Sequence, residues 1–384
     1  MIIKRVKGKA IKDSRRDLTI EVTLTTNVGK FSASAPNGKS KGKYEAKSYI
    51  KSITKDIQAL ENLSDYFSDE HLEKFSDLRR IEDITKGHVG ANTLFAFESA
   101  VLKAISKEQK KEIWELINPN AKIFPRFVGN CIGGGLHSAS GKKPDFQEFL
   151  LIPDFRSPSK NQKINLEIKE KLKELLKRKD QKFSDKKNDE NAWMTSLNEK
   201  EVFDILSQLE VPFGTDVAAS TFYKRKKYHY KNPQLDRRPD EQLMYMKNLA
   251  KNYKLFFIED PFDEEDFESF AKLLKAVPNS LVVGDDLTVT NYKRIEKAIE
   301  EKSINALIVK PNQNGSLVEV SRIIELTKKK GIKTIFSHRS GETKESILAD
   351  LAFGFQANFM KCGITGPERL AKIERLIEIE KKLK

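Results

Sequence analysis

The sequence predicts an α/β fold in which a (β/α)8-type barrel follows a smaller α+β region. The first observation is a repeated pattern between residues 255 and 363, where short apolar runs end in polar residues and amphipathic segments follow. The polar ends fall at 259, 285, 310, 338 and 361, every 23 to 28 residues, which is the length of a strand, a helix and two loops. The second observation is that the runs are apolar throughout, as in parallel strands buried on both faces.

The third observation is that the groups at these strand ends are chemically complementary. They are Glu259, Asp285, Lys310, the run His338-Arg339-Ser340, and Lys361. In a (β/α)8 barrel the carboxyl ends of the strands form the face that carries the active site. Carboxylates can hold a divalent metal, arginine and serine can bind an anion, and a lysine can move a proton. Strand ends also turn polar where they reach solvent, but that explanation does not account for five such positions.

The composition is that of a globular chain without a membrane span. The 384 residues are 38% hydrophobic and 9% aromatic, and no apolar run approaches the roughly 18 residues of a spanning helix. The N-terminus lacks the apolar core of a signal peptide, and Cys131 and Cys362 form neither a disulfide framework nor a CxxC pair. We therefore expect a cytoplasmic protein.

The net charge of +14 raises the question of nucleic-acid binding. The basic residues are scattered among 56 acidic ones and are densest at residues 169–187 and 224–231. A solvated helix face explains the first stretch, and the second has no specific binding pattern. We therefore expect neither a nucleic-acid partner nor a membrane partner.

The first 120 residues are predicted to form an α+β domain, with the barrel occupying residues 121–384. Leu18, Ile20, Val22 and Leu24 alternate with polar residues, and a turn at residues 27–29 leads into a second strand, which predicts a hairpin. Residues 45–62 and 91–105 carry apolar side chains at helical spacing. By composition alone, residues 36–43 form an ordinary connecting loop.

The next segment contains a glycine run that resembles a phosphate cradle. Gly133-Gly134-Gly135 precedes Leu136 and His137, but residues 146–152 are strand-like where a P-loop requires a helix. A phosphate loop is thereby excluded, and His137 alone would be a structural histidine. Further on, residues 164–176 are predicted to be helical, and Ser196 with Glu199 is predicted to cap a helix that runs to Leu209.

Several polar motifs spread over nearly the whole chain resemble the enolase family. They are Asp13-Ser14-Arg15, Ser40, Gly90-Ala91-Asn92, Gln147-Glu148-Phe149, Asp216-Val217-Ala218-Ala219-Ser220, Ile258-Glu259-Asp260-Pro261-Phe262, Gly284-Asp285-Asp286-Leu287-Thr288-Val289-Thr290, Ser337-His338-Arg339-Ser340-Gly341-Glu342-Thr343 and Glu368-Arg369-Leu370-Ala371-Lys372. The resemblance implies a barrel of the enolase kind and a phosphopyruvate hydratase. Such an enzyme would dehydrate 2-phosphoglycerate reversibly to phosphoenolpyruvate in glycolysis and gluconeogenesis, as a Mg²⁺-dependent homodimer.

The same resemblance implies roles for individual residues. Asp216, Glu259 and Asp285 match the ligands of a first Mg²⁺, and Ser40 matches a ligand of a second Mg²⁺ that arrives with substrate. Lys310 matches the base that removes the C2 proton, and Glu190 matches the acid that protonates the departing hydroxyl. Substrate-binding roles fall to Arg339 and Ser340 at the phosphate, and to His137, Gln147, Glu148, His338 and Lys361 elsewhere.

Elementary chemistry supports such a set of groups. A proton beside a carboxylate is weakly acidic, because its removal places a second negative charge on that carboxylate. Hard cations and Lys361 would stabilise the charge that develops there. Lys310 can act as a base only if burial and neighbouring positive charge lower its pKa.

The chain departs from the family pattern at several loops. Asp189-Glu190-Asn191-Ala192 stands where the family has Asp-Glu-Gly-Gly, Arg16-Asp17-Leu18 replaces Gly-Asn-Pro, and Asn37-Gly38-Lys39-Ser40 replaces Ser-Gly-Ala-Ser. The sequence ends at Lys384 without the usual C-terminal extension. These departures fall in loops and at the expected dimer edge, so they bear on turnover and oligomeric state more than on chemistry.

Two alternatives stay open at this point. One is a divergent lyase of the same superfamily that acts on another phosphorylated or acidic substrate. The other is a non-catalytic paralogue that uses the basic surface. Retention of Lys310, Lys361, Glu190 and the three metal carboxylates argues against a non-catalytic protein. The run His338-Arg339-Ser340 favours a phosphorylated substrate.

Overall fold

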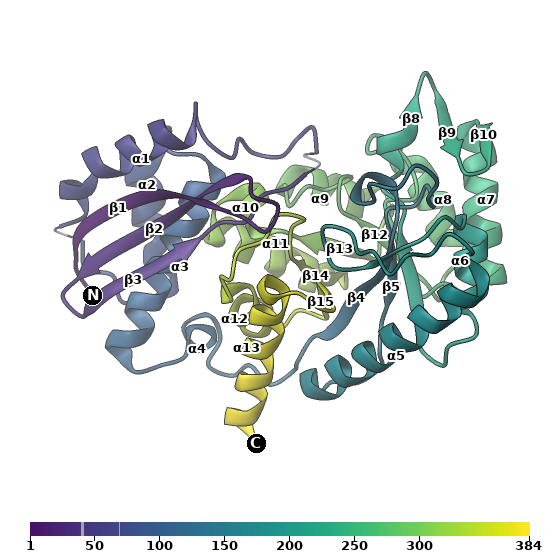
Figure 1. The fold of residues 1–384 in the computed structure, drawn as a ribbon. Helices are drawn as coiled ribbons and strands as arrows, with labels where there is room; N and C mark the ends of the chain where they lie inside the picture. The colour runs from purple at the N-terminus through teal and green to yellow at the C-terminus, as the bar shows by residue number, and fades with distance from the viewer. Residues whose placement is uncertain (40–41, 69) are drawn as a thin grey trace.

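The computed structural model describes residues 1–39, 42–68 and 70–384. An N-terminal antiparallel sheet with its helices lies beside a closed barrel that is ringed by further helices (Figure 1). The predicted α/β class, a barrel preceded by an α+β region, is confirmed. Within the described ranges, no helix is long and apolar enough to cross a membrane.

The N-terminal sheet has the strand order β1-β2-β3, from β1 (Ile3–Lys12), β2 (Leu18–Thr26) and β3 (Gly29–Ser34). The predicted hairpin is β2 with β3, and Ile20, Val22 and Leu24 are fully buried on one face. Leu18 was expected on that face but is 57% exposed, because it lies at the start of the strand. β1 was not predicted, since its lysine-rich sequence buries little more than Ile3 and Val6.

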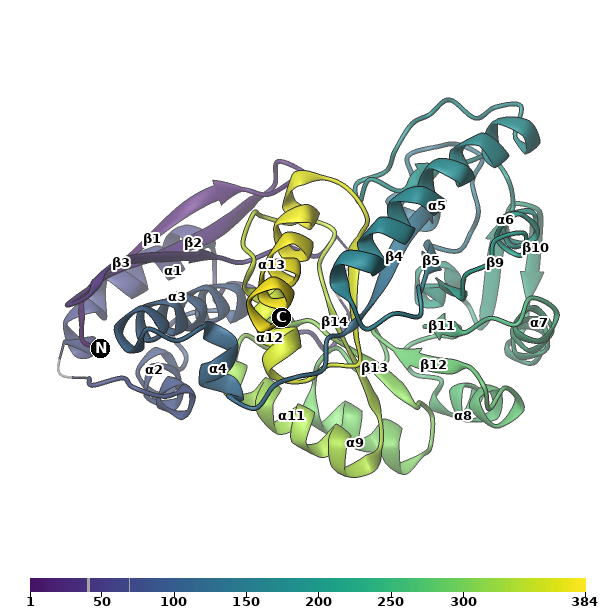
Figure 2. The same cartoon turned by 90° about the horizontal axis from the view of Figure 1, so that it is seen from below.

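Helices pack against this sheet (Figure 2). They are α1 (Ile53–Asn62), η1 (Ser64–Phe67) and α3 (Ala91–Gln109). Of the remaining helices of this region, α2 (Leu78–Thr85) and α4 (Ile113–Ile117) contact α3, and η2 (Phe75–Asp77) contacts α2. The helix expected over residues 45–62 begins only at Ile53, because the Ser52 side chain accepts a hydrogen bond from the Lys55 amide and starts the helix there. The predicted helix over residues 91–105 is confirmed as α3.

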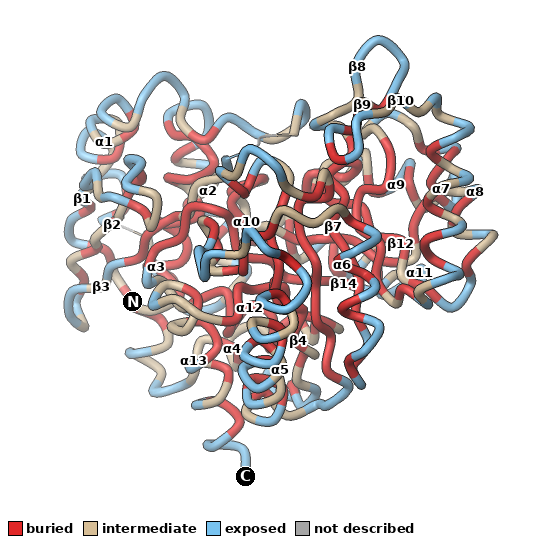
Figure 3. The backbone as a smooth tube through the Cα atoms, turned by 45° about the vertical axis from the view of Figure 1, so that its right-hand side comes forward, coloured by how far each residue is buried: buried red, intermediate tan, exposed pale blue. Residues whose placement is uncertain are grey.

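The barrel consists of eight strands, and β15 closes it by pairing with β4. The strands are β4 (Arg126–Gly133), β5 (Glu148–Leu151), β7 (Phe213–Asp216), β11 (Phe257–Glu259), β12 (Leu281–Gly284), β13 (Ala306–Val309), β14 (Lys333–Ser337) and β15 (Phe359–Gly363). The five strands predicted from the repeat are confirmed as β11 to β15. β5 runs antiparallel to both of its neighbours, so this barrel departs from an all-parallel one. Apolar residues such as Val128, Phe257 and Ile308 fill its interior, and Figure 3 shows the buried backbone concentrated there.

Helices surround the barrel, and short elements extend its connections. The helices are α5 (Pro158–Lys179), α6 (Glu199–Leu206), α7 (Pro239–Asn252), α8 (Phe267–Ala276), α9 (Tyr292–Glu300), α10 (Pro311–Asn314), α11 (Leu317–Lys330), α12 (Ile347–Gly354) and α13 (Pro367–Leu383). The short elements are η3 (Gly135–His137), η4 (Ala219–Phe222), β6 (Trp193–Met194) and the small sheet of β8 (Tyr223–Lys224), β9 (Lys227–Lys231) and β10 (Gln234–Arg237).

The predicted capping box of α6 is wrong by two residues. Asn198 caps the helix, and the Glu201 side chain accepts a hydrogen bond from the Asn198 amide. Ser196 instead donates its hydroxyl to Asp180, and Glu199 accepts a hydrogen bond from Tyr245. Both expected capping residues are therefore engaged by tertiary partners.

The N-terminal region contacts the barrel beside the carboxyl ends of its strands. Asn92 on α3 donates to Asn37 Oδ1 and accepts from Asn312. The backbone of Asn37 pairs with that of Gly341, just after β14. These contacts bring the segment around residues 37–39 to the mouth of the barrel.

Candidate active site

A cavity lies at the carboxyl ends of the barrel strands. The structure brings together here almost the whole set of predicted site residues. The lining includes His137, Gln147, Glu148, Glu190, Asp216, Asp285, Lys310, His338, Arg339, Ser340 and Lys361. Glu259 contacts Lys361 directly beneath them. Ser40, the remaining prediction, lies outside the described residues.

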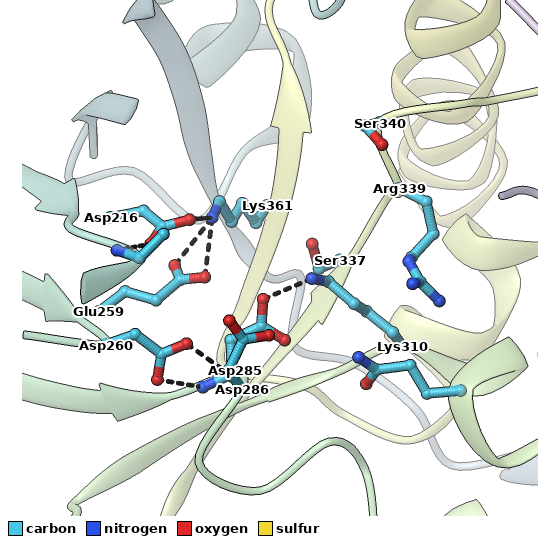
Figure 4. A network of polar contacts seen from close by, with 12 residues as sticks. Asp216, Glu259, Asp260, Asp285, Asp286, Lys310, Ser337, Arg339, Ser340 and Lys361 are labelled. Atoms are coloured by element: carbon cyan, nitrogen blue, oxygen red, sulfur yellow. Dashed lines mark hydrogen bonds and ion pairs between the residues drawn. The ribbon is translucent and has the colours of Figure 1, made fainter. Parts of the chain in front are cut away.

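The predicted metal carboxylates come from three adjacent strands. Asp216 at the end of β7 is in register with Glu259 at the end of β11, and Asp285 directly follows β12. Lys361 reaches them from β15, with its Nζ 2.8 Å from Glu259 Oε2 and 3.2 Å from Asp216 Oδ2 (Figure 4). Although burial opposes its charge, Asp216, Glu148 and Glu259 raise the pKa of Lys361 well above its ordinary value.

The donor set of these residues fits a divalent cation. All three carboxylates are buried, and burial and then Asp216 raise the pKa of Glu259 well above its ordinary value. Asp285 Oδ1 is also buried and has no hydrogen-bond partner among the described residues. Such concentrated and partly unpartnered oxygen ligands suit magnesium.

Asp260 supports the position of Asp285 through the backbone. Its two carboxylate oxygens accept hydrogen bonds from the amides of Asp285 at 3.0 Å and Asp286 at 2.6 Å (Figure 4). Ligand-type oxygens of Asp260, Asp285 and Asp286 lie within 4.8 Å of one another. Burial and the charge of Asp285 raise the pKa of Asp286 to about 7. Metal-binding potential at this edge therefore extends beyond the three predicted carboxylates.

The backbone is strained just after two of the predicted metal-binding carboxylates, Glu259 and Asp216. Asp260, next to Glu259, has φ 42°, and Ala218, two residues after Asp216, has φ 47°. Residues other than glycine rarely adopt this left-handed backbone conformation. The Ala218 amide donates to Asp216 Oδ1 at 3.0 Å, so the strained turn fixes the orientation of that carboxylate.

Lys310, the predicted base, is half-buried directly after β13 and forms an ion pair with Asp285. Burial, Arg339 and Lys361 favour the neutral amine, but Asp285 outweighs them and the pKa of Lys310 is raised. The lowered pKa that a base requires is therefore not present while Lys310 pairs with Asp285. Lys310 gains the character of a base only when Asp285 is engaged elsewhere.

The predicted acid, Glu190, belongs to a second cluster of ionisable groups. His137 Nδ1 lies 3.5 Å from Glu148 Oε1 and 3.6 Å from Glu190 Oε1. Asn130 on β4 donates to Glu190 Oε2 at 2.9 Å, and His338 Nε2 lies 3.6 Å from the same oxygen. One face of the cavity thus holds two carboxylates and two histidines.

Burial separates the proton affinities within this cluster. It lowers the pKa of His338 to about 3, although the charge of Glu190 opposes this shift. The pKa of Glu148 is raised well above its ordinary value, first by burial and then by the charge of Glu190. Burial opposes ionisation of Glu190 as well, but His338, His137 and Arg369 together lower its pKa. Glu148 therefore has the higher affinity for a proton of the two carboxylates.

The loop around Glu190 tolerates the two replaced glycines. Asn191 has φ 62°, a left-handed conformation that asparagine adopts more readily than most residues. Ala192 is buried and its φ is not positive. Asn188 Oδ1 accepts hydrogen bonds from the amides of Glu190 and Ala192. The side chain of Asn188 thus orders the loop from within.

Arg339 and Ser340, the predicted phosphate ligands, follow β14 and already have partners. Both terminal nitrogens of Arg339 lie 3.0 Å from the carboxylate oxygens of Glu45. Ser340 Oγ accepts from the Lys39 amide at 2.8 Å and from Arg15 Nη1 at 3.0 Å. A phosphate here would meet several positive groups and would compete with Glu45 for Arg339.

The sequence did not single out Glu45, Asn130, Asp260 or Arg15 as site residues. Asp260 and Arg15 lie inside motifs that were noted, so their polarity was a usable signal. Asn130 is a polar residue in a strand that is apolar apart from Arg126 at its start, which is a weaker signal. Glu45 gave no signal, because only folding brings its loop to Arg339.

Ionisable side chains gathered at the carboxyl ends of the strands form the arrangement that active sites have in (β/α)8-barrel enzymes. The family model "Enolase, C-terminal TIM barrel domain" matches residues 121–384. Three curated enolases are similar over almost their whole lengths. Identity is 34% to that of Methanosphaera stadtmanae (100% of this chain, 97% of the relative). It is 36% to that of Sulfolobus acidocaldarius (98% and 95%) and 32% to that of Thermoplasma acidophilum (98% and 98%).

The chain therefore belongs to the enolase family, and it is an enzyme of the lyase class.

Proposed function

We propose that this enzyme catalyses the reversible, Mg²⁺-dependent dehydration of 2-phosphoglycerate to phosphoenolpyruvate. The observation that carries the proposal is the placement of Lys310 and Lys361 on two strand ends around the carboxylates of Asp216, Glu259 and Asp285. One lysine can move a proton while the other stabilises a substrate carboxylate. The family membership supports the same reaction.

In the forward direction, the neutral amine of Lys310 removes the proton from C2. Burial, Arg339 and Lys361 favour that neutral form once Asp285 no longer pairs with the lysine. Lys361 stays protonated and stabilises the negative charge that develops on the substrate carboxylate. Asp216, Glu259 and Asp285 would hold one Mg²⁺ and Ser40 would contribute to a second, and these ions would supply further positive charge to stabilise the developing anion.

Loss of the C3 hydroxyl requires a proton from the opposite face of the cavity. We assign that transfer to Glu190, which faces the site beside Glu148 and His137. Because its pKa is lowered in this structure, Glu190 must gain a proton before it can act as an acid, and Glu148, whose pKa is raised, lies in the same cluster. Gln147 and His338 complete the substrate contacts in this assignment.

The substrate phosphate is assigned to Arg339 and Ser340. Arg15 and the Lys39 amide already point at Ser340 Oγ and add positive charge there. Release of Arg339 from Glu45 would free its two parallel donors for phosphate. This cluster argues for a phosphorylated substrate over an acid that lacks phosphate.

The proposal also covers the pathway, the cellular compartment, the oligomeric state and the domain boundaries. The enzyme would act in glycolysis and gluconeogenesis in the cytoplasm, as a homodimer. We divide each chain into an N-terminal domain of residues 1–120 and a barrel of residues 121–384.

An ultraviolet assay of phosphoenolpyruvate formation from 2-phosphoglycerate tests the reaction. We expect turnover that requires Mg²⁺ and disappears with EDTA. If the protein binds Mg²⁺ but forms no phosphoenolpyruvate, the reaction assigned here is wrong. A lyase for another acidic substrate or a non-catalytic paralogue would then be the better description.

A further inference from the structure

Lys169, in the middle of α5, is a buried lysine outside the cavity. Its residue exposure is 1%, and in the described parts of the chain no carboxylate lies within 4.0 Å of its amine. Burial and the nearby Lys187 lower the pKa of Lys169 to about 8. Burying an ammonium group without a counter-ion costs stability. The reason that Lys169 is buried here must therefore lie in its hydrogen-bond partners.

Those partners belong to the loop that carries Glu190 and to the connection after β15. Lys169 Nζ donates to the backbone oxygen of Asn191 and to Thr365 Oγ1, both at 2.5 Å. Its backbone oxygen accepts from Trp193 Nε1 at 3.0 Å. Lys169 therefore holds the chain on the C-terminal side of Glu190 at two points.

The two segments that Lys169 joins are already close to each other. A Cβ atom placed on Gly363 would lie 2.7 Å from the backbone oxygen of Glu190. One placed on Gly366 would lie 2.3 Å from Asn191 Nδ2. Within the loop, the bonds from Asn188 are local, whereas Asn130 and the pairing of β6 with β4 join this segment to β4. The contacts of Lys169 add a connection to α5 and to the segment after β15.

We infer that Lys169 is a positioning residue for Glu190: through Asn191 and Thr365 it holds the Glu190 loop against the connection after β15. It touches neither the cavity nor the Glu190 carboxylate. The inference rests on the proposed function, because it assigns Lys169 to the step in which Glu190 gives its proton. A loosened loop would impair that step and spare proton removal at Lys310.

The test is Lys169→Met, which keeps an apolar stem and removes the amine. We expect kcat for phosphoenolpyruvate formation to fall by about 10–100-fold, as for other supporting contacts around a site. KM for 2-phosphoglycerate and exchange of its C2 hydrogen in deuterated water should change little. Amide hydrogen exchange over residues 188–193 should become faster.

Lys173→Met is the matched control. Lys173 lies one turn further along α5, also faces the ring of Trp193, and pairs with the exposed Asp185. We expect this variant to behave like the parent protein. Parent-like turnover and amide exchange in Lys169→Met would overturn the inference, and so would equal losses of C2 exchange and phosphoenolpyruvate formation.

If Lys169→Met does not fold, Thr365→Val and Thr365→Ser decide the matter. The valine variant removes the hydroxyl that Lys169 uses and should show the same selective loss, while the serine variant should restore activity. Equal activity in both would overturn the inference. If the parent protein forms no phosphoenolpyruvate, the proposed function fails. The amide exchange over residues 188–193 then decides by itself whether Lys169 holds the loop.

Discussion

Lys361 and Glu259 form an ion pair across the centre of the barrel, with Lys361 Nζ 2.8 Å from Glu259 Oε2. Their strands, β15 and β11, are separated by three strands in either direction around the closed sheet. The pair therefore joins opposite walls at the point where the carboxylates converge. Each charge stabilises the other in a place where neither could be buried alone.

Lys361→Met should therefore destabilise the protein in EDTA by about 3–5 kcal/mol, because it leaves Glu259, Asp216 and Glu148 unpaired. Mg²⁺ should restore more stability to this variant than to the parent protein. Thermal unfolding with EDTA and with Mg²⁺ measures both effects. Lys297→Met, at an exposed pair with Glu301, is the control. An unchanged melting temperature of Lys361→Met in EDTA would mean that the lysine does not balance these carboxylates.

Asp285→Ala should weaken Mg²⁺ binding by more than about 100-fold, which exceeds the usual effect of a supporting residue. Asp260→Asn, which disturbs only the backbone amides of Asp285 and Asp286, should cost about 10–100-fold. Calorimetric titration with Mg²⁺ measures both affinities. Undiminished affinity in Asp285→Ala would reject the assigned metal site. Equal losses would place Asp260 among the ligands.

Lys310→Met should abolish exchange of the C2 hydrogen of 2-phosphoglycerate and lower turnover by about 10²–10⁴-fold, the usual contribution of a general base. Mg²⁺ affinity should not fall, since the variant frees Asp285 from its ion pair. Nuclear magnetic resonance in deuterated water follows the exchange. Continued exchange at the parent rate would show that another group is the base.

Glu190→Gln should stop phosphoenolpyruvate formation while exchange of the C2 hydrogen continues, because in the proposed mechanism proton removal at Lys310 precedes loss of the hydroxyl. Asp189→Asn is the matched control, since this neighbouring acid pairs with Lys39 near the surface. Both reactions can be followed in the same sample. If both survive in Glu190→Gln, the acid is another group, and Glu148 or His137 is next to be tested.

Glu380 on α13 gives a prediction about pH. Burial opposes its ionisation, but hydrogen bonds from Ser157, Lys384 and the Ser159 amide lower its pKa to about 2. A lowered folded-state pKa stabilises the fold above the unfolded value of about 4.3, and the stabilisation is lost as pH falls towards 2. Glu380→Gln should cost about 1–2 kcal/mol at pH 7 and much less near pH 2. Denaturant unfolding at both values checks this, and a cost independent of pH would contradict it.

The sequence by itself determined the barrel and the identity of its strand-end groups. Strands β11 to β15 are buried on both faces, so their apolar runs are visible without knowledge of any neighbour. Because the carboxyl ends of parallel strands meet, Glu259, Asp285, Lys310 and Lys361 could be placed at one site from their positions alone. The roles of individual groups came from the resemblance to the enolase family, and Ser40 stays a prediction.

The tertiary structure alone decided the pairings. Which lysine meets which carboxylate depends on side chains that cross the barrel, so the raised pKa of Lys310 could not be foreseen from its strand position. Glu45 meets Arg339, and Lys169 meets Asn191, across long separations that leave no local pattern. β1 was missed because an exposed, lysine-rich strand lacks the apolar alternation that marks a buried one. A periodic pattern of buried residues can be recognised in a short stretch of sequence. Contacts between residues far apart in the chain depend on distances that exist only after folding.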